Sequence, residues 1–225
     1  MTKTKKGDCV EIKYTGYLEG EPFDSNIPED LKRINEKAEP EKTVVIIGQG
    51  MVIQGLDKSL EEKELNKEYK IEVPYREGFG PKRRELVKTI PLSVFTKQGI
   101  NPKPGASLLL DNNLARIITI SGARVMTDFN NPLAGKDISY RFTITRIVTD
   151  EKEKAEAFFR NVFRYVPELE VKDKSIVAKG PKILEGAMNN VKGKFKELIG
   201  KDLEFEEKEP ERPKLEDKVD KNSKD

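Results

Sequence analysis

One short stretch of the sequence brings together side chains that could act chemically. Residues 14–26, YTGYLEGEPFDSN, begin with strand-like alternation and place Asp24 directly after Phe23. A carboxylate beside an aromatic ring is costly to bury unless hydrogen-bond donors surround it. Spacing alone favours a simple role, in which Asp24 caps a turn. The alternative is a carboxylate held in an apolar cleft, where Tyr14 or backbone N–H groups would anchor it.

The composition excludes several kinds of catalysis. The chain of 225 residues has no histidine and a single cysteine, Cys9. Histidine-dependent triads, histidine general bases, and zinc sites built from His or several Cys are therefore excluded. The sequence also lacks the GxxxxGK[ST] phosphate loop. An enzyme made from this chain must use carboxylates, Lys, Tyr, backbone groups and apolar shape, and we expect no metal and no cofactor.

Charge and cysteine usage indicate the setting of the chain. Lys+Arg total 42 and Asp+Glu total 40, and the net charge of +2 gives no bulk attraction to nucleic acid. The basic run KRRE at 82–85 is interpreted as a solvated hinge, because no aromatic stacking partners interleave with it. One cysteine fits a reducing compartment. The N-terminal residues lack an apolar signal core and no segment reaches membrane-span length, so we expect a cytoplasmic protein without a membrane partner.

The elements that must position Tyr14 and Asp24 are alternating strands around a short helix. Residues 8–18 place Val10, Ile12 and Tyr14 on one face of a strand. Alternating or β-branched runs predict further strands at 43–50, 67–75 and 138–148. In the last of these strands, four apolar residues lie on the same face: Ile138, Tyr140, Phe142 and Ile144.

Between these strands lie two segments with helical character. Residues 51–64 carry apolar side chains at helical spacing, Val52, Ile53, Leu56 and Leu60, and predict a short helix. Residues 27–42 are polar and helix-prone, and are interpreted as a surface insertion. Periodicity alone makes Tyr14, Ile53, Leu56 and Tyr140 ordinary core residues.

The pattern changes from about residue 87. KTIPLSVF predicts a short turn of helix with Pro91 at its start. Residues 100–130 then predict three short strands, separated by Pro-Gly, Asn-Asn and Ser-Gly turns. Strand-rich pieces thus lie on both sides of a different β unit. We predict a discontinuous first domain, 1–86 and 131–149, with a second domain, 87–130, inserted into it.

Residues 149–200 have helical patterns. Asp150 and Glu153 are spaced as a capping box, and an apolar stripe follows: Ala155, Phe158, Phe159, Val162, Phe163 and Val166. A hairpin, a second amphipathic helix ending at Gly200 and a closing strand come next. We predict an α+β domain at 150–207 and a disordered, charged tail at 208–225. The aromatic helix could pack inside its own unit or mediate a homodimer, and the sequence leaves both open.

Four motifs in a fixed order resemble the FKBP family of peptidyl-prolyl isomerases. They are VEIKYTGYLEGEPFDSN, IIGQGMVIQGLDKSL, YKIEVPYREGFG and NPLAGKDISYRFTITRI. The inserted unit resembles the insert-in-flap domain of the SlyD-like branch, and the C-terminal extension resembles that of the long-chain archaeal members. The resemblance implies an α+β fold in which an antiparallel half-barrel sheet wraps a short helix. It also implies peptidyl-prolyl cis-trans isomerase and folding-chaperone activities.

The resemblance further implies the residues of an apolar catalytic cleft. They are Tyr14, Phe23, Asp24, Val52, Ile53, Leu56, Phe79 and Tyr140. A backbone N–H at the lip, near Ile53, would hold a substrate carbonyl. Leu56 stands where the family often has Trp, which makes the floor shallower, and Phe79 stands where Tyr is usual, which removes a hydroxyl donor. With this pattern around it, Asp24 is assigned to the cleft rather than to a turn.

The insert has apolar residues on both faces of its short strands, more than so small a unit can bury. We predict that it binds unfolded chains by strand addition or through an exposed patch. The residues are Ile90, Val94, Phe95, Leu108, Leu110, Ile117 and Ile118. The alternative is that they pack against the rest of the protein.

The expected partners follow from these two sites. They are unfolded or proline-containing polypeptides, with the ribosome as a further candidate, and no nucleic acid is expected. Two other functions stay open at this point: a non-catalytic holdase, and a scaffold whose C-terminal domain recruits a partner.

Overall fold

The chain forms two compact units in a computed structural model that describes residues 3–208. The first unit is Met1–Ile147 and the second is Val148–Asp225. The first unit contains two sheets and the second contains one, and each unit has its own buried side chains. Within residues 3–208, no helix combines the length and the apolar character needed to cross a membrane.

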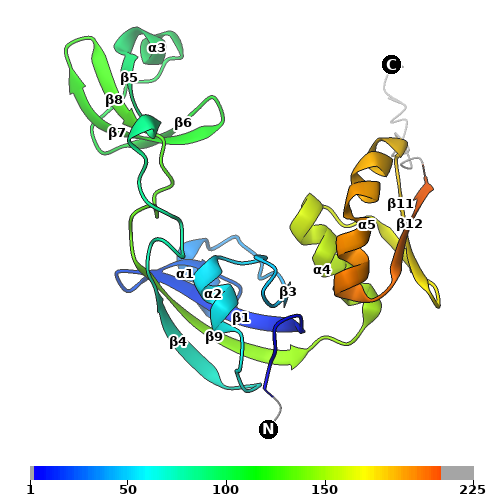
Figure 1. The fold of residues 1–225 in the computed structure, drawn as a ribbon. Coiled ribbons are helices and arrows are strands. Elements are labelled where there is room, and N and C mark those ends of the chain that lie inside the picture. The colour runs from blue at the N-terminus through cyan, green and yellow to red at the C-terminus, as the bar shows by residue number, and fades with distance from the viewer. Residues whose placement is uncertain (1–2, 209–225) are drawn as a thin grey trace, which may run out of the picture. The chain divides into compact units, whose positions relative to one another are not determined.

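A five-stranded antiparallel sheet dominates the first unit (Figure 1). Its strands are β1 (Cys9–Leu18), β2 (Glu21–Ser25), β3 (Thr43–Ile46), β4 (Glu68–Val73) and β9 (Ile138–Ile147). The order is β2-β1-β9-β4, and β3 also pairs with β1. The long central strands β1 and β9 therefore carry most of the pairing. The sheet does not close into a barrel, which confirms the predicted α+β half-barrel class.

The apolar face of this sheet packs on a short helix, α2 (Gln54–Ser59). The alternation predicted for β1 and β9 is confirmed, because Val10, Ile12, Phe142 and Ile144 are all fully buried. Leu56, from α2, joins the same core. Complete burial of one such aliphatic or aromatic side chain contributes roughly 1.5–3 kcal/mol. This packing fixes the two central strands against α2.

Residues 27–42 are only partly the surface insertion that the sequence predicts. They contain α1 (Pro28–Ile34), which begins with proline at its first position, as the fixed φ of proline favours. Asp30 of α1 is 8% exposed and accepts hydrogen bonds from Thr15 at 2.6 Å and from Arg141 at 2.8 Å. The interpretation of this segment as purely solvated is therefore wrong at Asp30, which joins α1 to the two central strands.

The inserted segment forms a separate four-stranded antiparallel sheet with a small core of its own (Figure 1). Its elements are η1 (Arg84–Leu86), β5 (Val87–Pro91), α3 (Leu92–Lys97), β6 (Ser107–Leu110), β7 (Asn113–Ser121) and β8 (Arg124–Asp128). The strand order is β5-β8-β7-β6. The sequence predicted a helical turn with Pro91 at its start, and α3 does follow Pro91 directly, whereas the pairing of residues 87–91 with β8 was not predicted.

The second unit packs two helices on a three-stranded sheet. Its elements are α4 (Glu151–Phe163), β10 (Glu168–Val171), β11 (Ser175–Gly180), η2 (Lys182–Leu184), α5 (Glu185–Ile199) and β12 (Asp202–Glu207). β10 and β11 form the predicted hairpin, and β12 pairs with β11 in parallel. The Asp150 carboxylate caps α4 by accepting a hydrogen bond from the Glu153 N–H at 2.7 Å, and Gly200 ends α5 in the left-handed conformation.

The aromatic stripe of α4 packs mainly inside its own unit. The rings of Phe158 and Phe159 lie 5.2 and 5.7 Å from that of Phe195 in α5, and all three are fully buried. Val162 was also predicted in the stripe, but its side chain is 39% exposed, so this part of the prediction is wrong. Of the predicted tail, Lys208 donates a backbone hydrogen bond to the Gly180 carbonyl, and the remainder lies outside the described residues.

Candidate active site

An aromatic cluster forms where β1, β2 and β9 lie side by side. We define it by Tyr14, Phe23, Phe79 and Tyr140. The Phe23 ring lies 5.9 Å from Tyr140 and 6.0 Å from Phe79, both edge to face, and the Tyr14 ring lies 6.0 Å from Tyr140. Edge-to-face pairs at this separation are favourable aromatic geometry. Tyr140 is buried, whereas the other three rings are half-buried, so the cluster presents aromatic surface to solvent.

Gly16 makes this arrangement possible, although no sequence pattern singled it out. It pairs with Tyr140 on one neighbouring strand and with Asp24 on the other. A Cβ at this position would lie 2.7 Å from Phe23 Cζ and 2.9 Å from Tyr140 Cε1. Both distances are shorter than real Cβ contacts, so any side chain at position 16 would displace the two rings. The aromatic cluster therefore requires a residue without a side chain at position 16.

Asp24 is anchored by Tyr14, in agreement with one of the two predicted alternatives. The Tyr14 hydroxyl donates a hydrogen bond to the Asp24 carboxylate, with 3.2 Å between oxygens. Asp24 lies within β2 rather than at a turn. The expectation that Asp24 is partly buried is wrong, since the residue is exposed. Its carboxylate thus lies at the solvent-facing edge of the cluster.

The two tyrosine hydroxyls are held in their protonated form. Burial raises the pKa of Tyr14 well above its ordinary value, and the negative charge and hydrogen bond of Asp24 raise it further. Burial also raises the pKa of Tyr140, with additional contributions from Asp24 and Tyr14. A protonated phenol remains a hydrogen-bond donor. Within residues 3–208 no partner is found for the Tyr140 hydroxyl, which leaves this donor available to a ligand.

The segment before α2 supplies a second edge. Val52 and Ile53 are half-buried and pack against the core, and Leu56 behind them is fully buried. Ile53 is the residue that precedes α2, and its carbonyl accepts from Asp57 at 2.9 Å. Its own N–H has no intramolecular hydrogen bond in the described part of the chain. A half-buried, unpaired N–H is a ready donor for a peptide carbonyl.

A buried carboxylate fixes the turn that leads to this edge. Asp57 is 7% exposed, and its two carboxylate oxygens accept hydrogen bonds from the Gly48 N–H at 2.8 Å and the Gly50 N–H at 2.9 Å. Both glycines have positive φ, which a side chain would disfavour. Asp57 was not singled out in the sequence. The only sequence signal for this role of Asp57 was its position seven residues after the GQG turn at 48–50.

The loop at 74–80 brings Phe79 to the cluster. The Gly80 N–H donates to the Tyr75 carbonyl at 2.7 Å, and the Gly55 N–H of α2 donates to the Glu77 carbonyl at 2.9 Å. The loop is thereby closed on itself and joined to α2. Phe79 is held over Phe23 as a result. The structure therefore gathers the eight residues predicted for the cleft in one region of the first unit.

The residues predicted for binding in the insert divide into three groups. Phe95, Leu110 and Ile117 are buried in the core of the insert and cannot contact a client in this conformation. Ile90 and Leu108 pack against that core, whereas Val94 and Ile118 are 38% and 44% exposed. The large exposed apolar residues that the prediction missed are Leu109, Leu114 and Met126. Alternation along β6 would have found Leu109, because Leu110 points inward.

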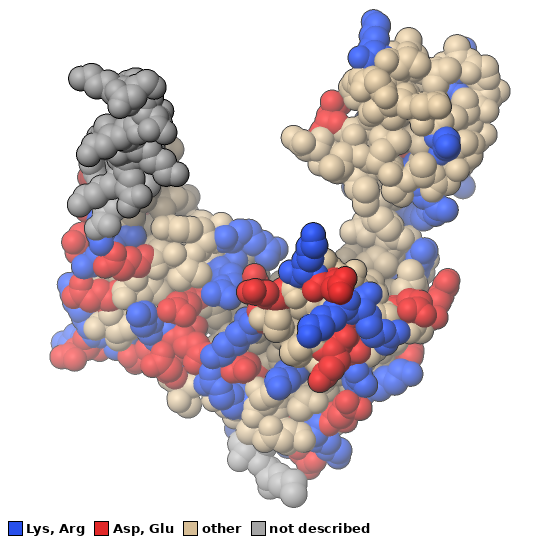
Figure 2. Space-filling model, turned by 180° about the vertical axis from the view of Figure 1, so that it is seen from behind, with Lys and Arg blue, Asp and Glu red and all other residues tan. Residues whose placement is uncertain are grey.

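These missed residues make the surface of the insert partly apolar. Leu109 is 66% exposed and is the cross-strand partner of Leu114. Figure 2 shows the insert, at the upper right, as mostly uncharged on the face turned to the viewer, with a few Lys, Arg and acidic side chains, whereas charged residues are denser over the main sheet region. A surface of this kind suits contact with apolar chain segments.

Comparisons with known proteins agree with this geometry. The family described as FKBP-type peptidyl-prolyl cis-trans isomerase matches residues 1–106, and the family described as FKBP26, IF domain matches residues 88–133. The short-type peptidyl-prolyl cis-trans isomerase of Methanocaldococcus jannaschii is 28% identical over 153 residues, covering 66% of this chain and 97% of the relative. The SlyD protein of Helicobacter pylori, an FKBP-type peptidyl-prolyl cis-trans isomerase, is 29% identical over 152 residues, covering 64% and 80%.

An open antiparallel half-barrel on a short helix, with an aromatic cluster at one side, defines an FKBP-type domain. Residues 1–106 belong to the family of FKBP-type peptidyl-prolyl cis-trans isomerases, and the insert matches the FKBP26 IF domain over residues 88–133. The predicted family, fold class and enzyme class are confirmed. The domain boundaries and the roles of individual site residues stay predictions.

Proposed function

We propose that the chain accelerates cis-trans isomerisation of X-Pro bonds in unfolded and partly folded polypeptides, and that the aromatic cluster is the catalytic surface. The observation that carries this proposal is the convergence of the Tyr14, Phe23, Phe79 and Tyr140 rings, together with an unpaired N–H at Ile53, which packs on the same core. This surface combines apolar area with a few fixed donors, which is the pattern of a ligand site.

The chemistry needs no covalent or proton-transfer group. Rotation of an X-Pro bond breaks amide resonance, with a barrier of about 18–20 kcal/mol. The amide loses charge separation as it twists, so an apolar surface disfavours the planar ground state relative to the twisted state. Catalysis then results from tighter binding of the twisted state. A chain without histidine can perform this reaction.

Each part of the site has a role in this proposal. The proline ring packs on the aromatic cluster above Leu56, while the Ile53 N–H holds a neighbouring carbonyl of the peptide. Ring and carbonyl are thus fixed while the prolyl amide turns between them. The Asp24 carboxylate orients the Tyr14 ring through the hydrogen bond between them and adds a negative field beside the rotating carbonyl.

A protease-coupled assay on a proline-containing tetrapeptide tests the catalytic role. Asp24→Ala should lower kcat by about tenfold and change KM less, as expected for the loss of one charged hydrogen bond that acts in the transition state. Tyr14→Phe removes the other partner of the same hydrogen bond and should lower kcat in the same direction. Unchanged kcat in both variants would remove this role of Asp24.

The insert is proposed to hold unfolded segments near the catalytic surface. Support comes from its exposed apolar residues, chiefly Leu109, Leu114 and Ile118. Replacing residues 88–130 by a short bridge should leave turnover of a tetrapeptide largely intact and slow the proline-limited refolding of a protein substrate. Leu109→Ser with Leu114→Ser should act in the same direction, and Ile183→Ser, at an 87% exposed position in the second unit, is the control. Unaffected refolding would exclude the insert as a client site.

The same assays separate the alternatives. A non-catalytic holdase would suppress aggregation but leave tetrapeptide isomerisation at the uncatalysed rate. For an isomerase, an apolar macrolide that covers the aromatic cluster should inhibit turnover. A partner-recruiting role of the second unit, with the ribosome or with a second copy of the chain, is tested by pull-down with residues 150–225.

A further inference from the structure

A small pocket lies where the insert joins the main sheet. It has a volume of about 190 Å³ and is lined by residues of both connecting segments and of the insert strands. This is below the roughly 300–1,000 Å³ of pockets for drug-sized ligands, so it suits one small chemical group. None of its residues belongs to the proposed isomerase site.

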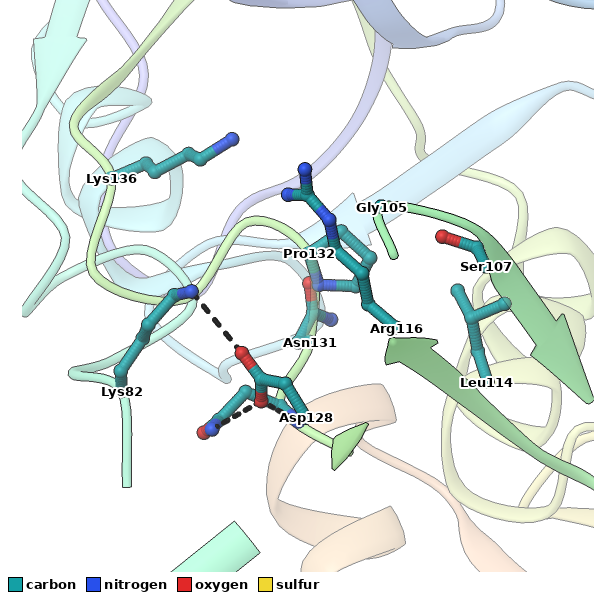
Figure 3. Close-up of a pocket in the computed structure, with 10 residues that line it drawn as sticks. Lys82, Gly105, Ser107, Leu114, Arg116, Asp128, Asn131, Pro132 and Lys136 are labelled. Atoms are coloured by element: carbon teal, nitrogen blue, oxygen red, sulfur yellow. Dashed lines mark hydrogen bonds and ion pairs between the residues drawn. The ribbon is translucent and has the colours of Figure 1, made fainter. Parts of the chain in front are cut away.

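Three cations surround this pocket. Lys82 and Lys136 come from the two segments that connect the main sheet to the insert, and Arg116 comes from β7 of the insert. Figure 3 shows the ammonium groups of both lysines and the guanidinium of Arg116 directed toward the same space. Like charges repel, so such a group is favourable only if an anion or water compensates it.

One carboxylate partly compensates these charges, but it is already occupied. Asp128 is 8% exposed, and its carboxylate lies 3.3 Å from the Lys82 ammonium. Its other oxygen accepts hydrogen bonds from the backbone and side-chain N–H groups of Asn130, at 2.8 and 2.7 Å. Burial raises the pKa of Asp128, but the hydrogen bonds from Asn130 and the charge of Lys82 outweigh this and hold it below its ordinary value. Asp128 therefore stays ionised and paired.

The other two cations have no such partner. Within residues 3–208, no hydrogen bond or ion pair is found for the side chains of Arg116 or Lys136. Ser107 and Asn131 add a hydroxyl and an amide to the lining, and the Asn131 side-chain oxygen is already used by the Leu133 N–H. The free groups of the pocket are therefore almost all donors. With Lys82 neutralised by Asp128, two positive charges remain.

We propose that this pocket binds a phosphate group, either as inorganic phosphate or as the terminal group of a small phosphomonoester. A phosphate carries a charge of about −1.5 to −2 at neutral pH and has three strong acceptor oxygens, which matches two free cations surrounded by neutral donors. Arg binds such planar or tetrahedral oxyanions with two parallel hydrogen bonds, and Lys acts as a point charge. A monovalent carboxylate would compensate only one of the two charges.

Binding has a structural consequence for the insert. The ligand would join Lys136, on a connecting segment, to Arg116 and Ser107, on the insert strands. The connecting segments are already tied together by Asn130, which accepts from the Arg83 N–H at 2.9 Å and donates to the Arg83 carbonyl at 3.0 Å. A bound phosphate would therefore restrain the insert, and amide exchange in residues 82–86 and 129–136 should slow in its presence.

The test is an NMR titration of the full chain with sodium phosphate at about pH 8, above the second pKa of a phosphate group, which is about 6. Sodium chloride keeps the ionic strength constant, and phenyl phosphate and acetate are titrated in parallel. Saturable amide shifts are expected at residues 105–107, 116 and 128–136. Tighter binding of phenyl phosphate than of inorganic phosphate would identify a phosphomonoester as the preferred source, and the reverse would identify the free ion.

Variants decide whether the site is specific. Arg116→Gln and Lys136→Gln should each weaken phosphate binding by roughly tenfold, the usual effect of one lost charge-assisted hydrogen bond. Arg124→Gln and Lys97→Gln remove equal charges from exposed positions of the insert outside the pocket, and should leave binding unchanged. Equal weakening in all four variants, acetate binding as tightly as phosphate, or shifts without saturation would each overturn the proposal. Tetrapeptide turnover should be unchanged in all four.

Discussion

Replacing Gly16 by alanine is the most direct test of how the backbone positions the aromatic cluster. The added Cβ would lie 2.7 Å from Phe23 Cζ and 2.9 Å from Tyr140 Cε1. Ordinary van der Waals contact begins at 3.4 Å, so the two rings must move by about 0.7 and 0.5 Å. Phe23 is half-buried and can turn outward, whereas Tyr140 is 3% exposed and can move only by disturbing the core.

The size of the effect follows from these displacements. Overpacking of this kind costs about 1–3 kcal/mol, and the freedom of Phe23 places the expected loss of stability near the lower end. Catalysis should suffer more than stability, because misplacing a positioning group by about 1 Å can cost about 100-fold in rate. We therefore expect kcat/KM on a proline tetrapeptide to fall by about 10- to 100-fold, while the protein remains folded.

The assay pairs tetrapeptide turnover with urea denaturation. Gly193→Ala is the matched control, because Gly193 lies in an exposed part of α5 with no heavy atom within 4 Å of the added Cβ. It should leave turnover unchanged and stabilise α5 by roughly 0.5–1 kcal/mol, since alanine favours a helix interior. Normal turnover in Gly16→Ala, with the two rings shown to be undisplaced, would refute the claim that a bare backbone at this position sets the site.

Three further predictions concern the carboxylates and phenols of the first unit. Asp57→Asn replaces one of two acceptors by a donor facing a backbone N–H, and should cost about 1–3 kcal/mol in urea denaturation and raise KM by loosening the turn before α2. Hydrogen bonds from Thr15 and Arg141 outweigh burial and lower the pKa of Asp30, so its contribution to stability is complete above its unfolded pKa of about 3.9 and is lost as pH falls through the lower folded value. The Asp30→Asn variant should therefore be less stable than the parent protein at neutral pH, and its free energy of unfolding should change less as the pH falls. An unchanged acid dependence of stability would contradict this. Because the pKa values of Tyr14 and Tyr140 are raised and histidine is absent, kcat/KM should be constant from about pH 6 to about pH 9, and a step within that range would show that another titrating group takes part.

Local patterns predicted most of the elements. Alternation along β1, β4 and β9 predicted three of the strands and the face that each buries, because a strand half-covered by a core repeats its environment every second residue. Asp150 marked the start of α4, because its carboxylate accepts a hydrogen bond from a free N–H of the first turn. Gly200 marked the end of α5, because glycine adopts the left-handed conformation that ends a helix. Pro91 marked the start of α3 correctly, but the strand at residues 87–91 was not predicted, because only pairing with β8 makes these residues a strand.

The candidate site was recognisable from ordered motifs, but its construction was not. The YTGYLEGEPFDSN motif pointed to Tyr14 and Asp24, yet spacing could not tell whether the carboxylate would be buried. The supporting residues Gly16 and Asp57 were missed, since each acts on groups brought close only by strand pairing or by the turn before α2. In the insert, the sequence identified apolar strands but could not assign which residues, such as Phe95, enter the core.

The sequence by itself determined the family, the strand faces and the absence of histidine chemistry, because these depend on residue identity and short-range periodicity. Only the tertiary structure decided which side chains meet. The approach of Gly16 to two rings and the cations around the insert pocket each bring together segments far apart in the chain. Such contacts are set by strand register and core packing, which are properties of the whole fold.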